Sequence, residues 1–213
     1  NEVLVSKPSP PQPNKNYVIG CDLAKHEDYT VCVVYDRGNN RQVYQDRWNE
    51  LSWPFAQAKI AELSKHYNNA PIVLDSTGIG DVVYDNLTRV GVPVTPFKFT
   101  NTSKQELIEK LSTYIELKRI SLLPLEETRR EFSEFGYEFS ERTNKVFYGA
   151  PSGFHDDIVI AHALAVWDMF PLYGRASNDN PTVVQGYKKQ LYAKKQRDYM
   201  DFEPDTFEEW SQE

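Results

Sequence analysis

The chain has 213 residues, enough for one domain with appended segments, and 40% of them are hydrophobic, which suffices for a buried core. No stretch of 18 apolar residues occurs, which excludes a membrane-spanning helix of the usual kind. The formal net charge of −7 argues against holding nucleic acid by bulk electrostatic attraction alone, but it allows an enzyme with a local basic groove.

The predicted elements begin after residues 1–16, where four prolines indicate an extended linker. Three strand-like runs follow, at residues 17–24, 29–35 and 42–48, and the short polar links between them favour antiparallel hairpins. Helices and strands then alternate. In chain order these are a helix at 52–67, a strand at 71–75, a helix at 78–90, a strand at 92–99, a helix starting at a capping box at 103–106, a short apolar segment at 119–123, a helix at 125–135, a hairpin of 137–140 with 145–148, and an apolar helix at 156–170.

This order predicts an α/β fold. We expect a mixed sheet whose first three strands are antiparallel and whose later strands are parallel, with helices on both faces and an added β-hairpin. The composition changes after Gly174, where a basic stretch at 186–197 precedes seven acidic residues at 198–213. We therefore divide the chain into a Pro-rich linker (1–16), a core domain (17–173) and a peripheral tail (174–213).

Four carboxylates stand at positions that favour a shared site. Asp22 ends the first strand, Asp75 ends the strand at 71–75, and Asp156 and Asp157 begin the last apolar helix. In a parallel or mixed sheet, neighbouring strand ends and an adjacent helix start converge on one crevice. Hard oxygen ligands without a dominant His or Cys set suit Mg²⁺ or Mn²⁺, and a cation would offset the repulsion between the acids.

Each of these acids also has an ordinary structural explanation. An Asp after a strand is commonly a turn residue, and an Asp at a helix start commonly caps the helix, which is worth about 0.5–2 kcal/mol. Capping requires only one acid, however, and Asp156 is followed by Asp157. The preceding His155 has two open interpretations, assistance in proton transfer or a structural contact at the helix start.

Three motifs together resemble a known family. They are Ile19-Gly20-Cys21-Asp22 before two further strands, Leu74-Asp75-Ser76-Thr77-Gly78-Ile79-Gly80-Asp81 before a helix, and His155-Asp156-Asp157-Ile158-Val159 at the start of the last core helix. The first is similar to the opening of ribonuclease H-like nucleases, and the other two are similar to the large terminase subunit of tailed bacteriophages. The resemblance covers about residues 17–170.

The resemblance implies a ribonuclease H-like endonuclease that cuts concatemeric double-stranded viral DNA during genome packaging. It implies that Asp22, Asp75 and Asp156 are catalytic metal ligands and that Asp157 is a further acid near the second of two Mg²⁺ or Mn²⁺ ions. It also implies an ATPase domain upstream in a longer polypeptide, which the first residue, Asn1 rather than Met, leads us to expect. The portal and the small terminase subunit are further implied partners, and the implied location is the cytoplasm of the infected bacterial host.

Contacts to DNA would have to come from local basic side chains, because the net charge is negative. The candidates follow the first strand, lie in loops or belong to the predicted hairpin, and each taken alone is an ordinary surface residue. They are Lys25, His26, Lys98, Lys104, Arg142 and Lys145.

Other functions remain open at this level. No Gly is followed by Lys in the sequence, so there is no P-loop and we expect no bound nucleotide in this fragment; Gly78-x-Gly80 also lacks the third glycine of a dinucleotide fingerprint. Another ribonuclease H-fold nuclease, such as a junction resolvase, would prefer four-way junctions to linear duplex. A non-catalytic packaging-complex docking module would show no metal-dependent cleavage.

Overall fold

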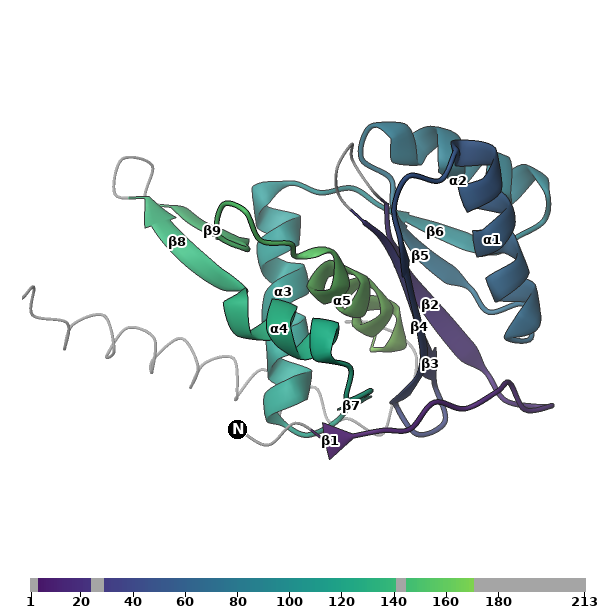
Figure 1. Ribbon diagram of the computed structural model, residues 1–213, viewed down its shortest axis with the longest axis horizontal. Coiled ribbons are helices and arrows are strands. Elements are labelled where there is room, and N and C mark those ends of the chain that lie inside the picture. Colours follow the sequence, from purple (N-terminus) through teal and green to yellow (C-terminus); the bar gives the residue numbers. More distant parts are fainter. Residues whose placement is uncertain (1–3, 24–28, 141–144, 171–213) are drawn as a thin grey trace, which may run out of the picture. The chain divides into compact units, whose positions relative to one another are not determined.

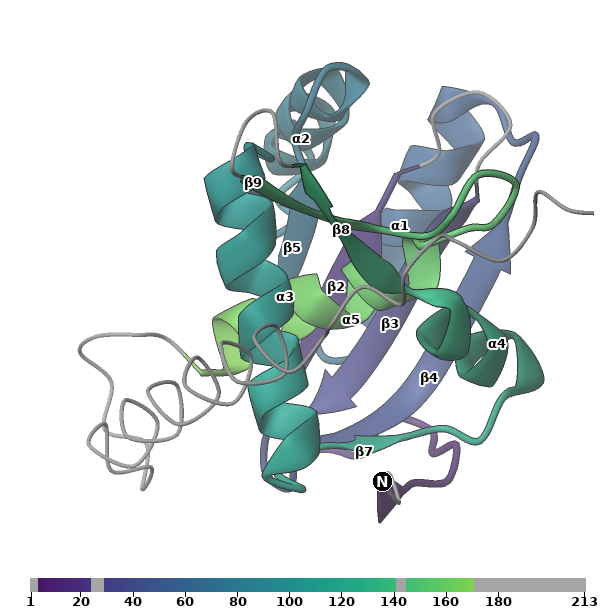
Figure 2. The same ribbon diagram turned by 90° about the vertical axis from the view of Figure 1, so that its left-hand side faces the viewer.

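The computed structural model of the protein describes residues 4–23, 29–140 and 145–170. A seven-stranded mixed sheet lies at its centre, with α1 (Trp53–His66) and α2 (Ile79–Arg89) on one face (Figure 1). On the other face, α5 (Asp157–Met169) packs directly on the central strands, and α3 (Asn101–Glu116) packs on the outer side of α5 (Figure 2). No helix in these described ranges is both long and apolar enough to cross a membrane.

The sheet has the predicted mixture of strand directions. The three strands β2 (Tyr17–Asp22), β3 (Thr30–Asp36) and β4 (Arg41–Trp48) are antiparallel neighbours, whereas β5 (Ile72–Asp75) is parallel to β2 and β6 (Val94–Phe97) is parallel to β5. This confirms the predicted fold class. The spatial order is β1-β7-β4-β3-β2-β5-β6, and the other elements are β1 (Leu4–Val5), β7 (Ser121–Leu122), α4 (Glu126–Glu134) and the hairpin of β8 (Gly136–Ser140) with β9 (Lys145–Gly149).

Helices cover both faces of the sheet, so its central strands are buried and apolar except near their ends. All residues of β2 and β3 are buried, and they divide by strand alternation between two cores. Val18, Val31 and Val33 face α3 and α5, while Ile19 and Cys21 face α1 and α2.

Gly20 allows α5 to approach β2 closely. A Cβ atom at this position would lie 2.0 Å from the carbonyl oxygen of Ala161 and 2.6 Å from the amide nitrogen of Ala165, far inside van der Waals contact. Only glycine fits this crossing, which lies two residues before Asp22. The crossing therefore holds the end of β2 next to α5.

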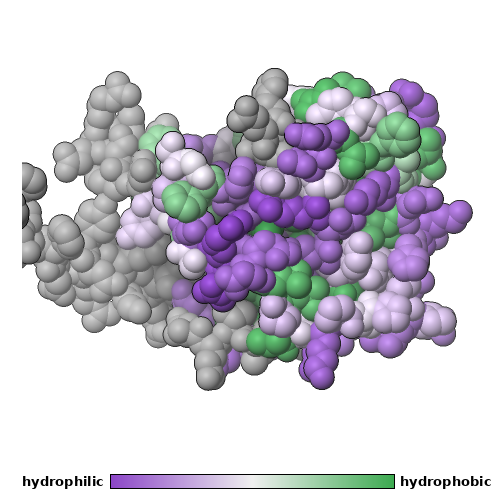
Figure 3. Space-filling model, in the orientation of Figure 1, coloured by the Kyte–Doolittle hydropathy of each residue, from purple (hydrophilic) through white to green (hydrophobic). Residues whose placement is uncertain are grey.

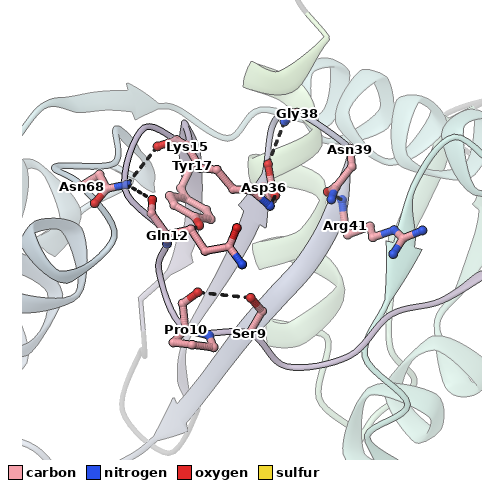
Figure 4. Close-up of polar contacts among 10 residues, drawn as sticks. All are labelled: Ser9, Pro10, Gln12, Lys15, Tyr17, Asp36, Gly38, Asn39, Arg41 and Asn68. Carbon is pink, nitrogen blue, oxygen red and sulfur yellow. Dashed lines mark hydrogen bonds and ion pairs between the residues drawn. The ribbon is translucent and has the colours of Figure 1, made fainter.

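Residues 4–16, which we call the strap, lie along the domain. β1 extends the sheet by pairing in parallel with β7. Asn68 Nδ2 donates hydrogen bonds to the carbonyl oxygens of Gln12 and Lys15, at 2.8 and 3.0 Å (Figure 4). Lys15 Nζ also lies 2.7 Å from Asp36 Oδ2. The strap is tied to the body of the domain at several points, and the Lys15 amide closes a turn within it by donating a hydrogen bond to the Gln12 carbonyl oxygen.

The beginning of α3 differs from the prediction. The sequence predicts Ser103 as the capping residue, but the N-cap is Thr100, whose backbone is extended at a φ of −128°. Thr100 Oγ1 accepts a hydrogen bond from the Ser103 amide at 3.1 Å, and Ser103 Oγ accepts one from the Thr100 amide at 2.8 Å. The prediction of the capping box was therefore wrong by three residues, because Ser103 is its second member.

Candidate metal centre

Two neighbouring strands deliver carboxylates to the same edge of the sheet. The parallel register of β2 and β5 pairs Cys21 with Leu74, so Asp22 and Asp75 are the next residues along the two strands. Asp75 is 3% exposed, and its Oδ1 accepts a hydrogen bond from the Thr77 amide at 2.8 Å. The turn needs a glycine at position 80, because a Cβ there would lie 2.1 Å from the Asp75 carbonyl oxygen.

The start of α5 delivers the other two acids. Asp156 is the N-cap residue and Asp157 is the first residue of the helix, yet among the described residues the Asp156 side chain makes no capping hydrogen bond. The cap comes from α4, where Glu131 Oε2 accepts a hydrogen bond from the Ile158 amide at 2.8 Å. Capping therefore does not explain the presence of Asp156.

All four acids line one pocket. Its volume is about 190 Å³, and Leu23, Phe99, Lys104 and Ile160 complete its wall beside Asp22, Asp75, Asp156 and Asp157. The pocket lies on the face of the sheet that α5 covers, whereas Cys21 packs into the core on the other face. The structure thus brings together the four acids that the sequence singled out.

Fixed polar groups hold these side chains. Lys104 Nζ on α3 lies 3.0 Å from Asp156 Oδ2. The Tyr29 amide donates a hydrogen bond of 3.3 Å to Asp157 Oδ2, and His155 Nδ1 lies 3.6 Å from the same oxygen. The rings of Tyr29 and His155 meet edge to face with centroids 5.3 Å apart, so His155 contacts both Asp157 and the residue that holds it.

The donor set fits a hard divalent cation, since carboxylate oxygens from three elements point into one pocket. Within the described ranges, however, no three Asp, Glu, His or Cys side chains are close enough to form a ready-made coordination group. Like charges repel, and a divalent cation would offset this repulsion among the acids of the pocket. Lys104 supplies one positive charge at this place.

The residues predicted to contact DNA lie at different distances from the pocket, and some lie outside the described residues. Lys104 lies in the pocket, and Lys98 lies after β6 with its Nζ 3.3 Å from Asp81 Oδ2 on the surface. Lys145 is the first residue of β9. The remaining three predicted residues, Lys25, His26 and Arg142, lie outside the described residues.

Sequence reasoning missed two residues beside the pocket, Glu131 and Arg47. Glu131 is 1% exposed and Arg47 Nη2 lies 3.3 Å from its Oε1. Burial raises the pKa of the Glu131 carboxyl, although the Ile158 amide and Arg47 act in the opposite direction. Glu131 sits in an amphipathic helix among other charged residues, so its burial has no local signal in the sequence.

A larger pocket, of about 730 Å³, has a different character. Its wall includes Trp48, Trp53 and Ile79, and Glu50 is the one acidic residue among the described residues that line it. Apolar surface gathers over the α1 and α2 end of the molecule, where Phe55 and Val82 are exposed (Figure 3). The chemistry therefore favours the smaller, carboxylate-lined pocket as the functional site.

Comparison with known proteins adds a family match. The family model described as terminase RNaseH-like domain matches residues 19–166, a span that contains all four pocket acids. The large terminase subunit of Thermus virus P23-45 is 32% identical over 155 residues, which are 72% of this chain and 32% of that protein. That of Thermus phage G20c is 31% identical over the same length. The chain thus matches about a third of the length of these curated relatives.

Solved structures agree with the sequence comparison. The large terminase nuclease of thermophilic phage G20c with bound magnesium has a TM-score of 0.72 and 27% identity, over 76% of this chain and 92% of that one. The large terminase nuclease domain of Thermus phage P74-26 has a TM-score of 0.71 and 25% identity, over 82% of this chain and 94% of that one. The ribonuclease H-like fold and the resemblance drawn from the sequence are confirmed.

Proposed function

This chain belongs to the family of terminase RNase H-like domains, and we propose that it is a metal-dependent endonuclease that cuts concatemeric double-stranded viral DNA during packaging. The observation that carries the proposal is the convergence of Asp22, Asp75, Asp156 and Asp157 on one pocket. The G20c nuclease, at 25–27% identity, has been solved with magnesium, cobalt and zinc, which supports a divalent cation here.

The four aspartates would hold the cation. Asp22 and Asp75 extend from the rigid central strands, whereas Asp156 and Asp157 come from the start of α5, so the pocket has one fixed wall and one helical wall. When bound, Mg²⁺ or Mn²⁺ supplies an activated water and neutralises charge on the phosphate; two such ions are our expectation for this family.

Among the basic side chains that the structure describes, Lys104 is the one best placed to meet the scissile phosphate. Its ammonium group lies in the pocket and is paired with Asp156. An entering phosphate oxygen offers Lys104 a second anionic partner at the same place. Lys98, with its side chain largely exposed beside the carboxyl end of β6, would contact the DNA backbone farther from the chemistry.

The alternatives explain less of the structure. A docking module whose acids only cap helices does not account for Asp156, because Glu131 supplies the cap of α5. A junction resolvase would use the same fold and acids, but the matching family model and the Thermus phage relatives described above are terminases.

The proposal also includes the partners of the domain and its location in the cell. As part of a terminase large subunit, the chain would work beside an ATPase domain, the portal and the small subunit in the cytoplasm of the infected bacterial host. Its division into linker, nuclease domain at 17–173 and tail is part of the same proposal.

One cleavage assay tests the function. The chain is incubated with linear duplex DNA, a four-way junction, duplex RNA and an RNA–DNA hybrid, each with Mg²⁺, Mn²⁺ or EDTA. We expect metal-dependent cutting of duplex DNA, no faster cutting of the junction, and loss of cutting in Asp22→Asn. Faster cutting of junctions would favour a resolvase, cutting of RNA would remove the specificity for DNA, and no cutting with any metal would refute the nuclease.

A further inference from the structure

A buried carboxylate on one helix caps another helix at the metal centre. Glu131 of α4 accepts the Ile158 amide hydrogen at the second position of α5, directly after Asp156 and Asp157. The N-terminus of α5 is thus fastened to α4. Asp156 and Asp157 both belong to this short stretch of backbone. The hydrogen bond to Glu131 therefore fixes the backbone positions from which their side chains extend.

Arg47 extends this connection to the sheet. Its Nη2 atom lies 3.3 Å from Glu131 Oε1, and its guanidinium carbon lies 3.5 Å from the centre of the Tyr29 ring. Such a stacked guanidinium holds an aromatic ring by a cation–π interaction. Arg47 therefore joins Glu131 on α4 to Tyr29, the residue that precedes β3.

Tyr29 in turn holds the side chain of Asp157. Its amide donates to Asp157 Oδ2 at 3.3 Å, and its ring packs against His155, which also contacts that oxygen. The contacts form two arms that start from one ion pair. One runs from Glu131 to the backbone of α5, and the other runs from Arg47 through Tyr29 to the carboxylate of Asp157.

A role in orientation explains this ion pair better than a role in stability. Buried ion pairs often add no more stability than well-packed apolar side chains of similar volume, because both charges lose their hydration. In contrast, residues that contact a metal ligand without touching the metal set the orientation of that ligand. Mutating such a residue typically lowers metal affinity about ten- to a hundredfold.

We propose that Glu131 and Arg47 are positioning residues that hold Asp156 and Asp157 in the orientation that receives the divalent cation. The inference rests on the proposed nuclease function and assigns the two residues no contact with the reacting atoms. Neither residue is among the four acids, and each acts through α5 or Tyr29.

The chain offers a matched control. Thr128 lies on α4 one turn before Glu131, is 3% exposed, and its Oγ1 donates at 3.0 Å to Gln45 on β4, two residues before Arg47. Thr128→Val thus removes a part-buried hydrogen bond between the same helix and the same strand, at a residue whose hydrogen bond involves neither α5 nor Tyr29.

The test compares Mn²⁺ affinity, measured by the electron paramagnetic resonance of free Mn²⁺, with thermal stability and cleavage. Glu131→Ala and Arg47→Met should raise the Kd for Mn²⁺ by about ten- to a hundredfold. Excess Mn²⁺ should restore much of their cleavage rate. Glu131→Gln, which keeps an oxygen for the Ile158 amide, should recover part of the affinity, and Thr128→Val should bind Mn²⁺ like the wild type even where it melts earlier.

Unchanged Mn²⁺ affinity in Glu131→Ala and Arg47→Met would overturn the inference, as would an equal loss of affinity in Thr128→Val. If Glu131→Ala does not fold, the same comparison is made with Arg47→Met and Arg47→Lys, where Lys cannot reproduce the planar stack on Tyr29. A wild-type chain that binds Mn²⁺ but cuts nothing would refute the nuclease function and leave the positioning role measurable.

Discussion

The helices on the two faces of the sheet bury different kinds of side chain. Within the described ranges, α1 and α2 bury small and apolar residues, with Ser64 as their one buried polar side chain. The helices of the other face bury charged and titratable groups, which are Glu109, Lys110, Tyr114, Glu131, Asp157 and His162. The core under α1 and α2 is thus the more apolar of the two, and changes on the two faces should have different consequences.

The largest effect should follow removal of a pocket charge. Asp75→Asn keeps an oxygen for the Thr77 amide, so we expect an unchanged or higher melting temperature, because one repelling charge is lost. The cleavage rate should fall by more than about a hundredfold. Mutating a residue that only supports a metal ligand costs up to about a hundredfold, and Asp75 is proposed as a ligand itself. Asp85→Asn, on the exposed side of α2, is the control and should leave both quantities unchanged. A large loss of stability in Asp75→Asn would instead indicate a structural role.

The next effect concerns the close contact between β2 and α5. Gly20→Ala places a methyl group against the α5 backbone and should lower the free energy of unfolding by about 1–3 kcal/mol. Because α5 must then move away from β2, Mn²⁺ affinity should fall as well. Ile60→Val, in the core under α1, should cost about 0.5–1.5 kcal/mol without changing metal affinity. Denaturant unfolding measures the stability of each variant, and Mn²⁺ titration measures its metal affinity. Equal metal affinity in the two variants would contradict the expected link between the β2–α5 contact and the metal site.

His162 should make the α5 face sensitive to acid. It is fully buried beside Tyr35, with Nδ1 2.7 Å from the hydroxyl oxygen, and burial lowers its pKa to about 3. Between pH 6.5 and 3 the unfolded chain binds a proton here that the native chain does not, so stability falls as the pH falls, by up to about 1.4 kcal/mol per pH unit. His162→Gln should reduce this slope in urea unfolding between pH 6 and 4. His66→Gln, at an exposed position on α1, should not; an unchanged slope in His162→Gln would show that other groups cause it.

The smallest effect is expected for the thiols under α1 and α2. Cys21 and Cys32 are fully buried with sulfur atoms 3.2 Å apart, and burial raises the pKa of the Cys21 thiol. Both should resist thiol reagents until the protein unfolds, because the thiolate is the reactive form. Cys32→Ala should cost about 1 kcal/mol of stability and leave cleavage unchanged. Rapid labelling of the native protein, or loss of cleavage, would show that this face is not reserved for packing.

Local patterns in the sequence were enough to predict much of the fold and to single out the four acids of the pocket. Asp22 and Asp75 end apolar strands, and Asp156 begins an apolar helix, so their convergence followed from the strand order. Glu131 could not be found in this way, since its partner Ile158 is 27 residues away and the charged sequence of α4 predicts a solvated helix. The two-residue strand β1 was also missed, because its pairing with β7 depends on tertiary contacts rather than on any periodic pattern.

The strap has a consequence for the solubility of the domain. β1 forms the outer edge of the sheet and covers β7, a strand of only two residues that in turn borders β4. A chain cut at residue 17 would lose this cover and leave the Leu122 carbonyl oxygen without the Ser6 amide, which donates a hydrogen bond to it at 2.7 Å. Unpaired strand edges recruit strands from other molecules, and proteins commonly cover them for this reason. Chains that lack the strap should therefore self-associate more readily than chains that keep it.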